Sequence, residues 1–152
     1  MEIGATKAVQ DRLKTTKIEE SKGTSLVFCW DTHLTKIKRR NVLFIVNASN
    51  RYTIAMTDIE PRNWNYYTMY ISRVIHGVMQ EMGYSEDQIG QYFKMSGDTT
   101  VTKTHGRKSV GGINRMVMDA QYFGKKLEKD TKYQWELSEY LNRDICQPEG
   151  FD

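Results

Sequence analysis

Three apolar runs separated by short polar segments occupy the first part of the chain. They are Ser25–Trp30, Val42–Val46 and Tyr52–Met56, and their β-branched and aromatic residues are typical of strands. The continuous run Val42–Val46 favours a central strand that is buried on both faces. Asn47–Asn50 is typical of a turn, because Asn and Ser side chains bond the local backbone. The pattern therefore predicts an antiparallel β-meander over about residues 24–58.

After Pro61, apolar residues recur every three or four positions, which is the period of a helix that faces a core. The longest stripe runs from Trp64 to Met82 and predicts one long helix that ends at Gly83, a residue suited to a helix C-terminus. Ser85–Gln88 has the sequence of a capping box and predicts the start of a second, shorter helix.

The second half of the chain combines a candidate strand with further helices. Thr99–Thr104 is β-branched and predicts an added strand, and the stripe Ile113–Phe123 predicts a helix that begins near Ser109. Thr131–Gln134 resembles a second capping box before a last helix, and Thr6–Leu13 has a weak helical stripe. The expected fold class is α+β: an antiparallel β-meander with an added strand near 99–104, packed against three to four helices in a single domain.

Composition narrows the function more than the fold. The 152 residues carry 22 basic and 19 acidic side chains, a net charge of +3, so a nucleic-acid contact would have to rest on a local basic patch. Cys29 and Cys146 lie in no zinc-like or redox spacing, which predicts reduced thiols in a cytoplasmic protein. No stretch approaches the roughly 20 apolar residues that span a bilayer, so no membrane contact is expected.

The three histidines, His33, His76 and His105, are the first candidates for catalysis. His33 begins a His-Leu-Thr sequence of the kind found in two-histidine phosphoesterases, which need one His as base and another as acid. His76 and His105 lack the hydroxyl residue, so the enzymatic hypothesis, cleavage of a phosphodiester through His33 or His105, ranks last. The chain has no phosphate-binding or dinucleotide-binding glycine motif and no spacing typical of metal ligands, so neither a cofactor nor a metal is expected.

Two polar segments are more informative. Lys36–Arg40 has four cations in five residues. They could bind an anion through the planar forks of arginine, or could protect a solvated strand edge. Thr102–Asn114 concentrates small residues, hydroxyls and cations before a predicted helix, which suits anion binding at a helix N-terminus. The alternative is structural: Ser109 caps the helix, and two glycines let it pack closely on the sheet.

These segments supply the candidate binding residues for an anionic ligand, a nucleotide or short nucleic acid. Four cations and four hydrogen-bonding side chains are included: Arg39, Arg40, Lys103, Arg107, Thr102, Thr104, Ser109 and Asn114. A joint site would lie where the basic edge of the meander meets the start of the helix.

Short motifs lie along most of the chain: Thr6-Lys7 to Leu13, Phe28-Cys29-Trp30, Ile37-Lys38-Arg39-Arg40 to Asn47, Thr102-Lys103-Thr104, Arg107 to Asn114, and Leu137-Ser138 to Leu141 with Cys146. In these motifs the chain resembles an uncharacterised domain-of-unknown-function family found in bacterial, plasmid and phage genomes. Ile113 stands where the family usually has Met. The resemblance implies no activity, but its recurring motifs include both polar segments.

The leading functional hypothesis is a small non-enzymatic binding protein for an anionic ligand. The alternative is a protein–protein inhibitor of a host immune factor, encoded by a phage or mobile element and acting in the host cytoplasm. Its contact surface would be a hydrophobic patch around Trp64, Tyr66 and Trp135. A homo-oligomer is compatible with either hypothesis.

Overall fold

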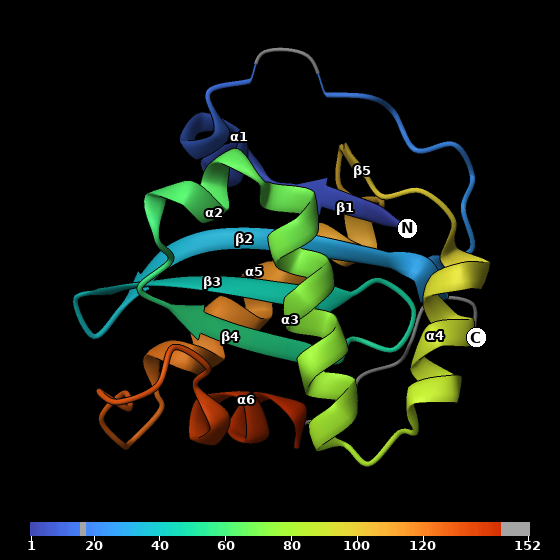
Figure 1. The fold of residues 1–152 in the computed structure, drawn as a ribbon. Coiled ribbons are helices and arrows are strands. Elements are labelled where there is room, and N and C mark those ends of the chain that lie inside the picture. The colour runs from blue at the N-terminus through green and yellow to red at the C-terminus, as the bar shows by residue number, and fades with distance from the viewer. Residues whose placement is uncertain (16–17, 144–152) are drawn as a thin grey trace.

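A five-stranded mixed sheet forms the centre of the protein (Figure 1). The computed structural model describes residues 1–15 and 18–143. The strands lie in the order β4-β3-β2-β1-β5. Their bounds are Glu2–Ala5 for β1, Cys29–Ile37 for β2, Arg40–Asn47 for β3, Thr53–Thr57 for β4 and Thr100–Thr102 for β5.

The meander predicted from the apolar runs is confirmed. β2 pairs antiparallel with β3, and β3 pairs antiparallel with β4. The added strand β5 is also present, but it does not join the meander. It pairs parallel with β1, which pairs parallel with β2 on its other side. The sheet is therefore mixed, because an unpredicted N-terminal strand lies between the meander and β5.

Helices cover both faces of the sheet. The bounds are Lys7–Leu13 for α1, Pro61–Asn65 for α2, Tyr67–Glu81 for α3, Glu86–Ser96 for α4, Arg107–Gln121 for α5 and Trp135–Asn142 for α6. One apolar cluster joins α1, α2 and α3 to the sheet, and a second joins α5 and α6 to the other face. α3 crosses in front of the sheet in Figure 1, and α5 lies behind it.

Alternation along the central strand supplies both clusters. Leu43 and Ile45 of β3 face α3, whereas Val42, Phe44 and Val46 face α5 and α6. All five are almost completely buried, and each buried side chain of this size stabilises the fold by about 1.5–3 kcal/mol. The continuous apolar run therefore corresponds to a strand that is buried on both faces, as predicted.

Several predicted boundaries are wrong. Leu26–Phe28 forms a short 3-10 helix, so the first strand of the meander begins at Cys29. The long helix predicted from Trp64 is divided at Tyr66, whose φ of −118° and ψ of 48° are not helical. The number of helices in the described residues, α1 to α6, exceeds the three to four expected.

The two predicted capping boxes have different outcomes. Both reciprocal bonds between Ser85 and Gln88 are present at the start of α4, as predicted. The second capping box is wrong, because α6 begins at Trp135 and its N-cap residue Gln134 makes no side-chain cap. The buried Gln134 side chain instead donates to Thr57 Oγ1 and to two carbonyl oxygens of the preceding loop. In the described part of the chain no helix is long and apolar enough to cross a membrane.

Candidate functional site

A row of polar residues lies on the α5 face of the sheet, where β1 and β2 pair. Glu2 of β1 is opposite Cys29 of β2, and Gly4 is opposite Asp31. Because side chains alternate along a strand, these four residues share one face. Glu2 is 3% exposed, and Cys29 and Asp31 are fully buried, so this part of the sheet has a polar interior.

Asp31 is the centre of a hydrogen-bonded network that reaches the start of α5. Its carboxylate lies 2.6 Å from His105 Nδ1 and accepts a bond of 3.1 Å from the His105 backbone N–H. It also accepts a bond from the hydroxyl of Ser109, which is itself buried. The network therefore connects β2 to the turn between β5 and α5.

Gly4 makes room for this carboxylate. A Cβ atom at residue 4 would overlap Asp31 Oδ1, and it would lie 3.1 Å from the Cα atom of Thr104. Only glycine fits between Asp31 and Thr104 without moving one of them. The sequence of β1 is therefore constrained by the site as well as by strand pairing.

Glu2 is held by the loop that precedes β2. Its two carboxylate oxygens accept bonds of 3.1 Å from the Ser21 hydroxyl and the Lys22 backbone N–H. Burial alone would raise the pKa of Glu2, but hydrogen bonds from Thr24, Ser21 and Lys22 outweigh it and lower the pKa. Glu2 is therefore a buried carboxylate that these bonds hold in its charged form.

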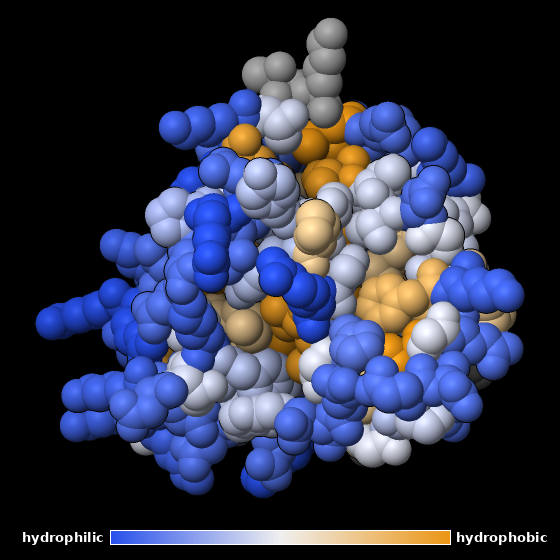
Figure 2. All heavy atoms as spheres, in the orientation of Figure 1, coloured by the Kyte–Doolittle hydropathy of each residue, from blue (hydrophilic) through white to orange (hydrophobic). Residues whose placement is uncertain are grey.

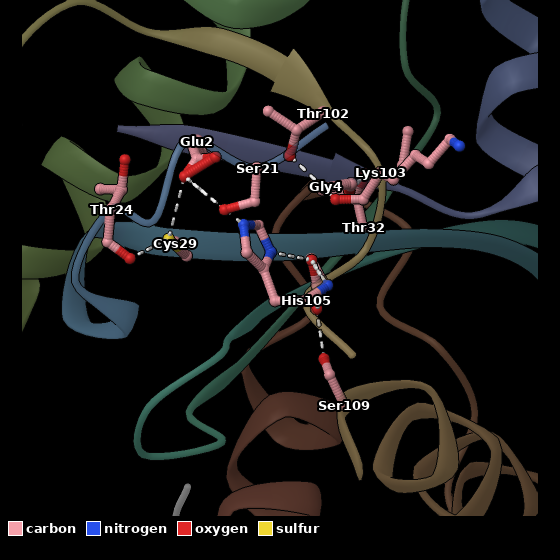
Figure 3. A network of polar contacts seen from close by, with 12 residues as sticks. Glu2, Gly4, Ser21, Thr24, Cys29, Thr32, Thr102, Lys103, His105 and Ser109 are labelled. Carbon is pink, nitrogen blue, oxygen red and sulfur yellow. Dashed lines mark hydrogen bonds and ion pairs between the residues drawn. The ribbon is translucent and has the colours of Figure 1, made fainter. Parts of the chain in front are cut away.

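His105 completes the buried cluster. Figure 3 shows its ring between the side chains of Glu2 and Ser109. Burial would lower the pKa of His105, but the hydrogen bond to Asp31 and the nearby Asp31 and Cys29 side chains raise it to about 10. The ring nitrogen Nε2 is buried without a hydrogen-bond partner in the described structure, and it lies 3.8 Å from Glu2 Oε2. Nδ1 is thus fixed by Asp31, while Nε2 points toward Glu2.

A second polar region lies at the opposite end of β2, at the β2–β3 hairpin. Lys38 and Arg39 form its two-residue turn, and both have left-handed backbone conformations with φ of 50° and 68°. Two successive positive φ values are typical of the turn that suits hairpin twist, a turn that favours Asn-Gly. Lys-Arg in this position is less stable than Asn-Gly, because both side chains are in a region that bulky residues disfavour.

Two cavities flank the hairpin. A cavity of about 410 Å³ is lined by the three arginines Arg12, Arg39 and Arg40, together with Trp64 and Asp58. A neighbouring cavity of about 330 Å³ shares Arg40 and Asp58 and adds three lysines, Lys38, Lys126 and Lys129. The left side of the molecule in Figure 2, over this hairpin, is covered by strongly hydrophilic side chains. We call these six cations the hairpin patch.

The hairpin patch is only partly neutralised. Arg40 Nη2 lies 2.7 Å from Asp58 Oδ2 in an ion pair, and Arg40 Nη1 donates a hydrogen bond to the Glu128 carbonyl oxygen. The guanidinium of Arg12 lies 4.9 Å from the centre of the Trp64 ring. The other four members, Lys38, Arg39, Lys126 and Lys129, make no ion pair with any described residue. Among the described residues, Asp58 is the one carboxylate that lines either cavity.

The candidate binding residues from the sequence fall into two separate groups. Arg39 and Arg40 belong to the hairpin patch, whereas Thr102 is aligned with Gly4 and hence with Asp31. Ile37 at the hairpin lies six positions after Asp31 along β2, which is about 20 Å at the rise of a strand. The expected joint site is therefore wrong, because the basic hairpin and the start of α5 lie at opposite ends of β2.

The second group has mixed environments. Lys103 forms an exposed ion pair with Glu20, and Thr102 is buried with its hydroxyl bonded to the Lys103 carbonyl oxygen. Thr104 is half-buried beside Gly4, and Arg107 and Asn114 are exposed on α5.

The structural alternative for the second group is also only partly right. Ser109 does not cap α5, which begins at Arg107 after Gly106. It lies inside the first turn and bonds Asp31. A Cβ atom at Gly112 would meet the Arg51 guanidinium at 2.6 Å, so its close approach is to the β3–β4 loop.

One other sequence-based assignment requires correction. Trp64 was expected on an exposed hydrophobic patch, but it is 7% exposed and packs against Tyr67 with ring centres 5.4 Å apart. His33 is half-buried, with Nδ1 2.9 Å from the Thr6 hydroxyl, and burial lowers its pKa. Cys146 lies outside the described residues.

In a comparison with protein families, the Domain of unknown function (DUF6933) matches residues 2–152 of the chain. The chain belongs to this family. The resemblance of the short motifs to a domain of unknown function is thereby confirmed. No curated protein and no solved structure matches the chain.

Proposed function

We propose that this DUF6933 protein is a non-enzymatic binding protein that holds a phosphate-bearing anion, a nucleotide or short nucleic acid, at the hairpin patch. The observation that carries the proposal is the cavity of about 410 Å³ that Arg12, Arg39 and Arg40 line together. Arginine suits this role because its planar guanidinium can donate two parallel hydrogen bonds to one phosphate.

Existing contacts already order two of the three arginines. Asp58 and the Glu128 carbonyl oxygen fix Arg40, and Trp64 supports the Arg12 guanidinium. Side chains that are positioned before binding lose less conformational entropy when the ligand arrives. Arg39 is exposed and without an ion pair among the described residues, so it is available to close over a ligand.

The strained turn also supports a binding role. A left-handed conformation at two successive non-glycine residues costs roughly 1 kcal/mol or more for each. Asn-Gly would relieve this cost, yet the hairpin carries Lys38 and Arg39. Replacement by Asn-Gly would remove both charged side chains, and each of them contributes a cation to the hairpin patch.

Access distinguishes this proposal from phosphodiester cleavage. The His105 side chain is 3% exposed and pairs with Asp31, and His33 is half-buried, with Nδ1 hydrogen-bonded to the Thr6 hydroxyl. A phosphodiester on the protein surface would reach the arginines of the hairpin patch before either imidazole.

The test is a binding screen with matched charge changes. Fluorescence anisotropy of a labelled short RNA, with calorimetry of mononucleotides and cyclic dinucleotides, would be performed on wild type, Lys38→Gln/Arg39→Gln and Lys103→Gln/Arg107→Gln. Each double variant removes two exposed cations. We expect the hairpin variant alone to weaken binding, by at least tenfold.

The salt dependence provides a second measurement. For a single strand, each lost phosphate contact reduces the slope of log affinity against log salt by about 0.7. The hairpin variant should therefore have a slope shallower by about 1.4 if both cations meet phosphates. Equal loss of affinity in the two double variants, or no binding by wild type to any probe, would refute the proposal.

A further inference from the structure

A second site lies in the buried cluster, independent of the hairpin patch. We propose that Glu2, Cys29 and His105 bind one divalent transition-metal ion with the ligand preferences of zinc. The three side chains come from β1, β2 and the turn before α5, and one ligand atom of each lies within 4.8 Å of the others.

The separations of the ligand atoms fit tetrahedral coordination. Zinc lies about 2.0–2.3 Å from nitrogen, oxygen or sulfur ligands, so tetrahedral ligand atoms are roughly 3.3–3.8 Å apart. Glu2 Oε2 is 3.7 Å from Cys29 Sγ and 3.8 Å from His105 Nε2. An ion between these atoms needs little movement of the three side chains. One coordination position is left for a further ligand.

His105 has the orientation that a metal ligand requires. Its side chain is 3% exposed, and Nε2 lacks a hydrogen-bond partner in the described structure. A buried polar atom without a partner is unfavourable, and such atoms often indicate a missing ion or water. Nε2 faces Glu2 Oε2, and a bound cation would satisfy it.

Asp31 supplies the outer support that metal-binding histidines commonly have. It binds His105 Nδ1 at 2.6 Å and leaves Nε2 as the ligand atom, which is the carboxylate–histidine–metal arrangement. Ser109 orients Asp31 in turn, while Ser21 and the Lys22 N–H orient Glu2. Two of the three ligands thus already have fixed directions.

The charges in the cluster also favour a cation. Glu2 and Asp31 are buried carboxylates, and among the described residues both are paired with the single imidazole of His105, so that two acidic groups share one basic group. Buried charges are usually paired or coordinate a metal. The presence of a thiol and an imidazole beside one carboxylate favours zinc or a similar transition metal over magnesium or calcium, which prefer oxygen ligands.

Burial also decides between two roles for Cys29. A Cys-His-Asp group could act as a nucleophile, its base and an orienting carboxylate. Cys29 is fully buried, however, and its sulfur is surrounded by Glu2 Oε2 and the carbonyl oxygens of Thr24 and Ser25. A substrate cannot approach it as a nucleophile must be approached, whereas a single ion can be enclosed during folding.

The experiment uses the full chain, stripped with a chelator and titrated with Co²⁺ and with Zn²⁺. Co²⁺ reports thiolate coordination through a charge-transfer absorption band, and Zn²⁺ competes for the same site. We expect one Co²⁺ per chain, a thiolate band, and displacement by one equivalent of Zn²⁺. The band should vanish in Cys29→Ser and persist in Cys146→Ser, which removes the other cysteine.

Further variants separate ligands from support. Glu2→Gln and His105→Gln should lower Zn²⁺ affinity strongly, Asp31→Asn should lower it about 10–100-fold, and His33→Gln on the same strand should leave it unchanged. If a variant fails to fold, the Co²⁺ titration of wild type still shows whether the chain binds a metal through a thiolate. Absence of a thiolate band in wild type, or a band that survives in Cys29→Ser, would overturn the proposal.

Discussion

Adding one methyl group at Gly4 should have a large effect, because this position has no free space. The Cβ atom of Gly4→Ala would overlap Asp31 Oδ1 and would lie 3.0 Å from Asp31 Cγ. Thr104 Cα, a backbone atom at 3.1 Å, limits movement on the other side. The Asp31 carboxylate must therefore move, and it cannot do so while keeping its hydrogen bonds.

The magnitude follows from what Asp31 would lose. It accepts hydrogen bonds from the His105 backbone N–H and the Ser109 hydroxyl, and it pairs with the His105 ring at 2.6 Å. Separating the partners of a buried pair costs about 3–5 kcal/mol. We expect Gly4→Ala to lower the free energy of unfolding by a similar amount. For a domain of this size the melting temperature should fall by roughly 10 °C.

The assay is urea unfolding in the presence of a chelator, followed by tryptophan fluorescence and circular dichroism. Gly77→Ala is the matched control, because Gly77 is inside α3 and a Cβ atom there meets nothing within 4 Å. Alanine is favoured over glycine in a helix by about 0.5–1 kcal/mol, so the control should be slightly more stable than wild type.

A double variant tests the cause. With Asp31→Ala the carboxylate is gone, so adding Gly4→Ala to that variant should cost at least about 2 kcal/mol less than adding it to wild type. Additive effects of the two changes would refute the steric explanation. So would a Gly4→Ala protein with the stability of Gly77→Ala.

Three further changes test other parts of the structure. Lys38→Asn/Arg39→Gly should raise the free energy of unfolding by about 1 kcal/mol in a urea titration, because Asn-Gly suits the left-handed turn. Burial lowers the pKa of His33, so the folded state resists its protonation. Wild type should therefore lose stability as pH falls below about 6.5, and His33→Gln should lose less between pH 7 and pH 5 in the same titration. Ser138→Ala should lower the free energy of unfolding by about 1–3 kcal/mol, measured by thermal unfolding. The reason is that Ser138 Oγ accepts a buried hydrogen bond of 3.0 Å from the Ala55 backbone N–H.

The sequence was sufficient for the meander because its strands carry their own signal. The central strand β3 contains the continuous run Val42–Val46, which is buried on both faces. β1 carries no such signal: Glu2–Ala5 has one large apolar residue, Ile3, between a carboxylate and a glycine. It becomes a strand through parallel pairing on both sides, which is a tertiary effect that periodicity cannot reveal. Missing β1 therefore also meant missing the mixed character of the sheet.

The same difference applies to the hairpin patch. Arg39 and Arg40 were predictable from local charge density, since Lys36–Arg40 contains four cations. Arg12, Lys126 and Lys129 come from distant positions and join the hairpin only in the fold. Local density thus located the centre of the basic region, while its cavities depend on how α1 and the segment after α5 are placed.

The buried cluster shows the strongest dependence on topology. Glu2 and Cys29 are 27 positions apart in the sequence, and Asp31 and His105 are 74 positions apart. Such long separations form no short motif that could be recognised in the sequence. β1 and β5 have only four and three residues, and few ladder bonds hold them. The buried cluster joins β1, β2 and the turn after β5 on the sheet face that α5 and α6 cover. The apolar cluster on that face contains no residue of β1 or β5. Polar contacts centred on Asp31 thus take the place of apolar packing at this edge, and Gly4 leaves the space that they need.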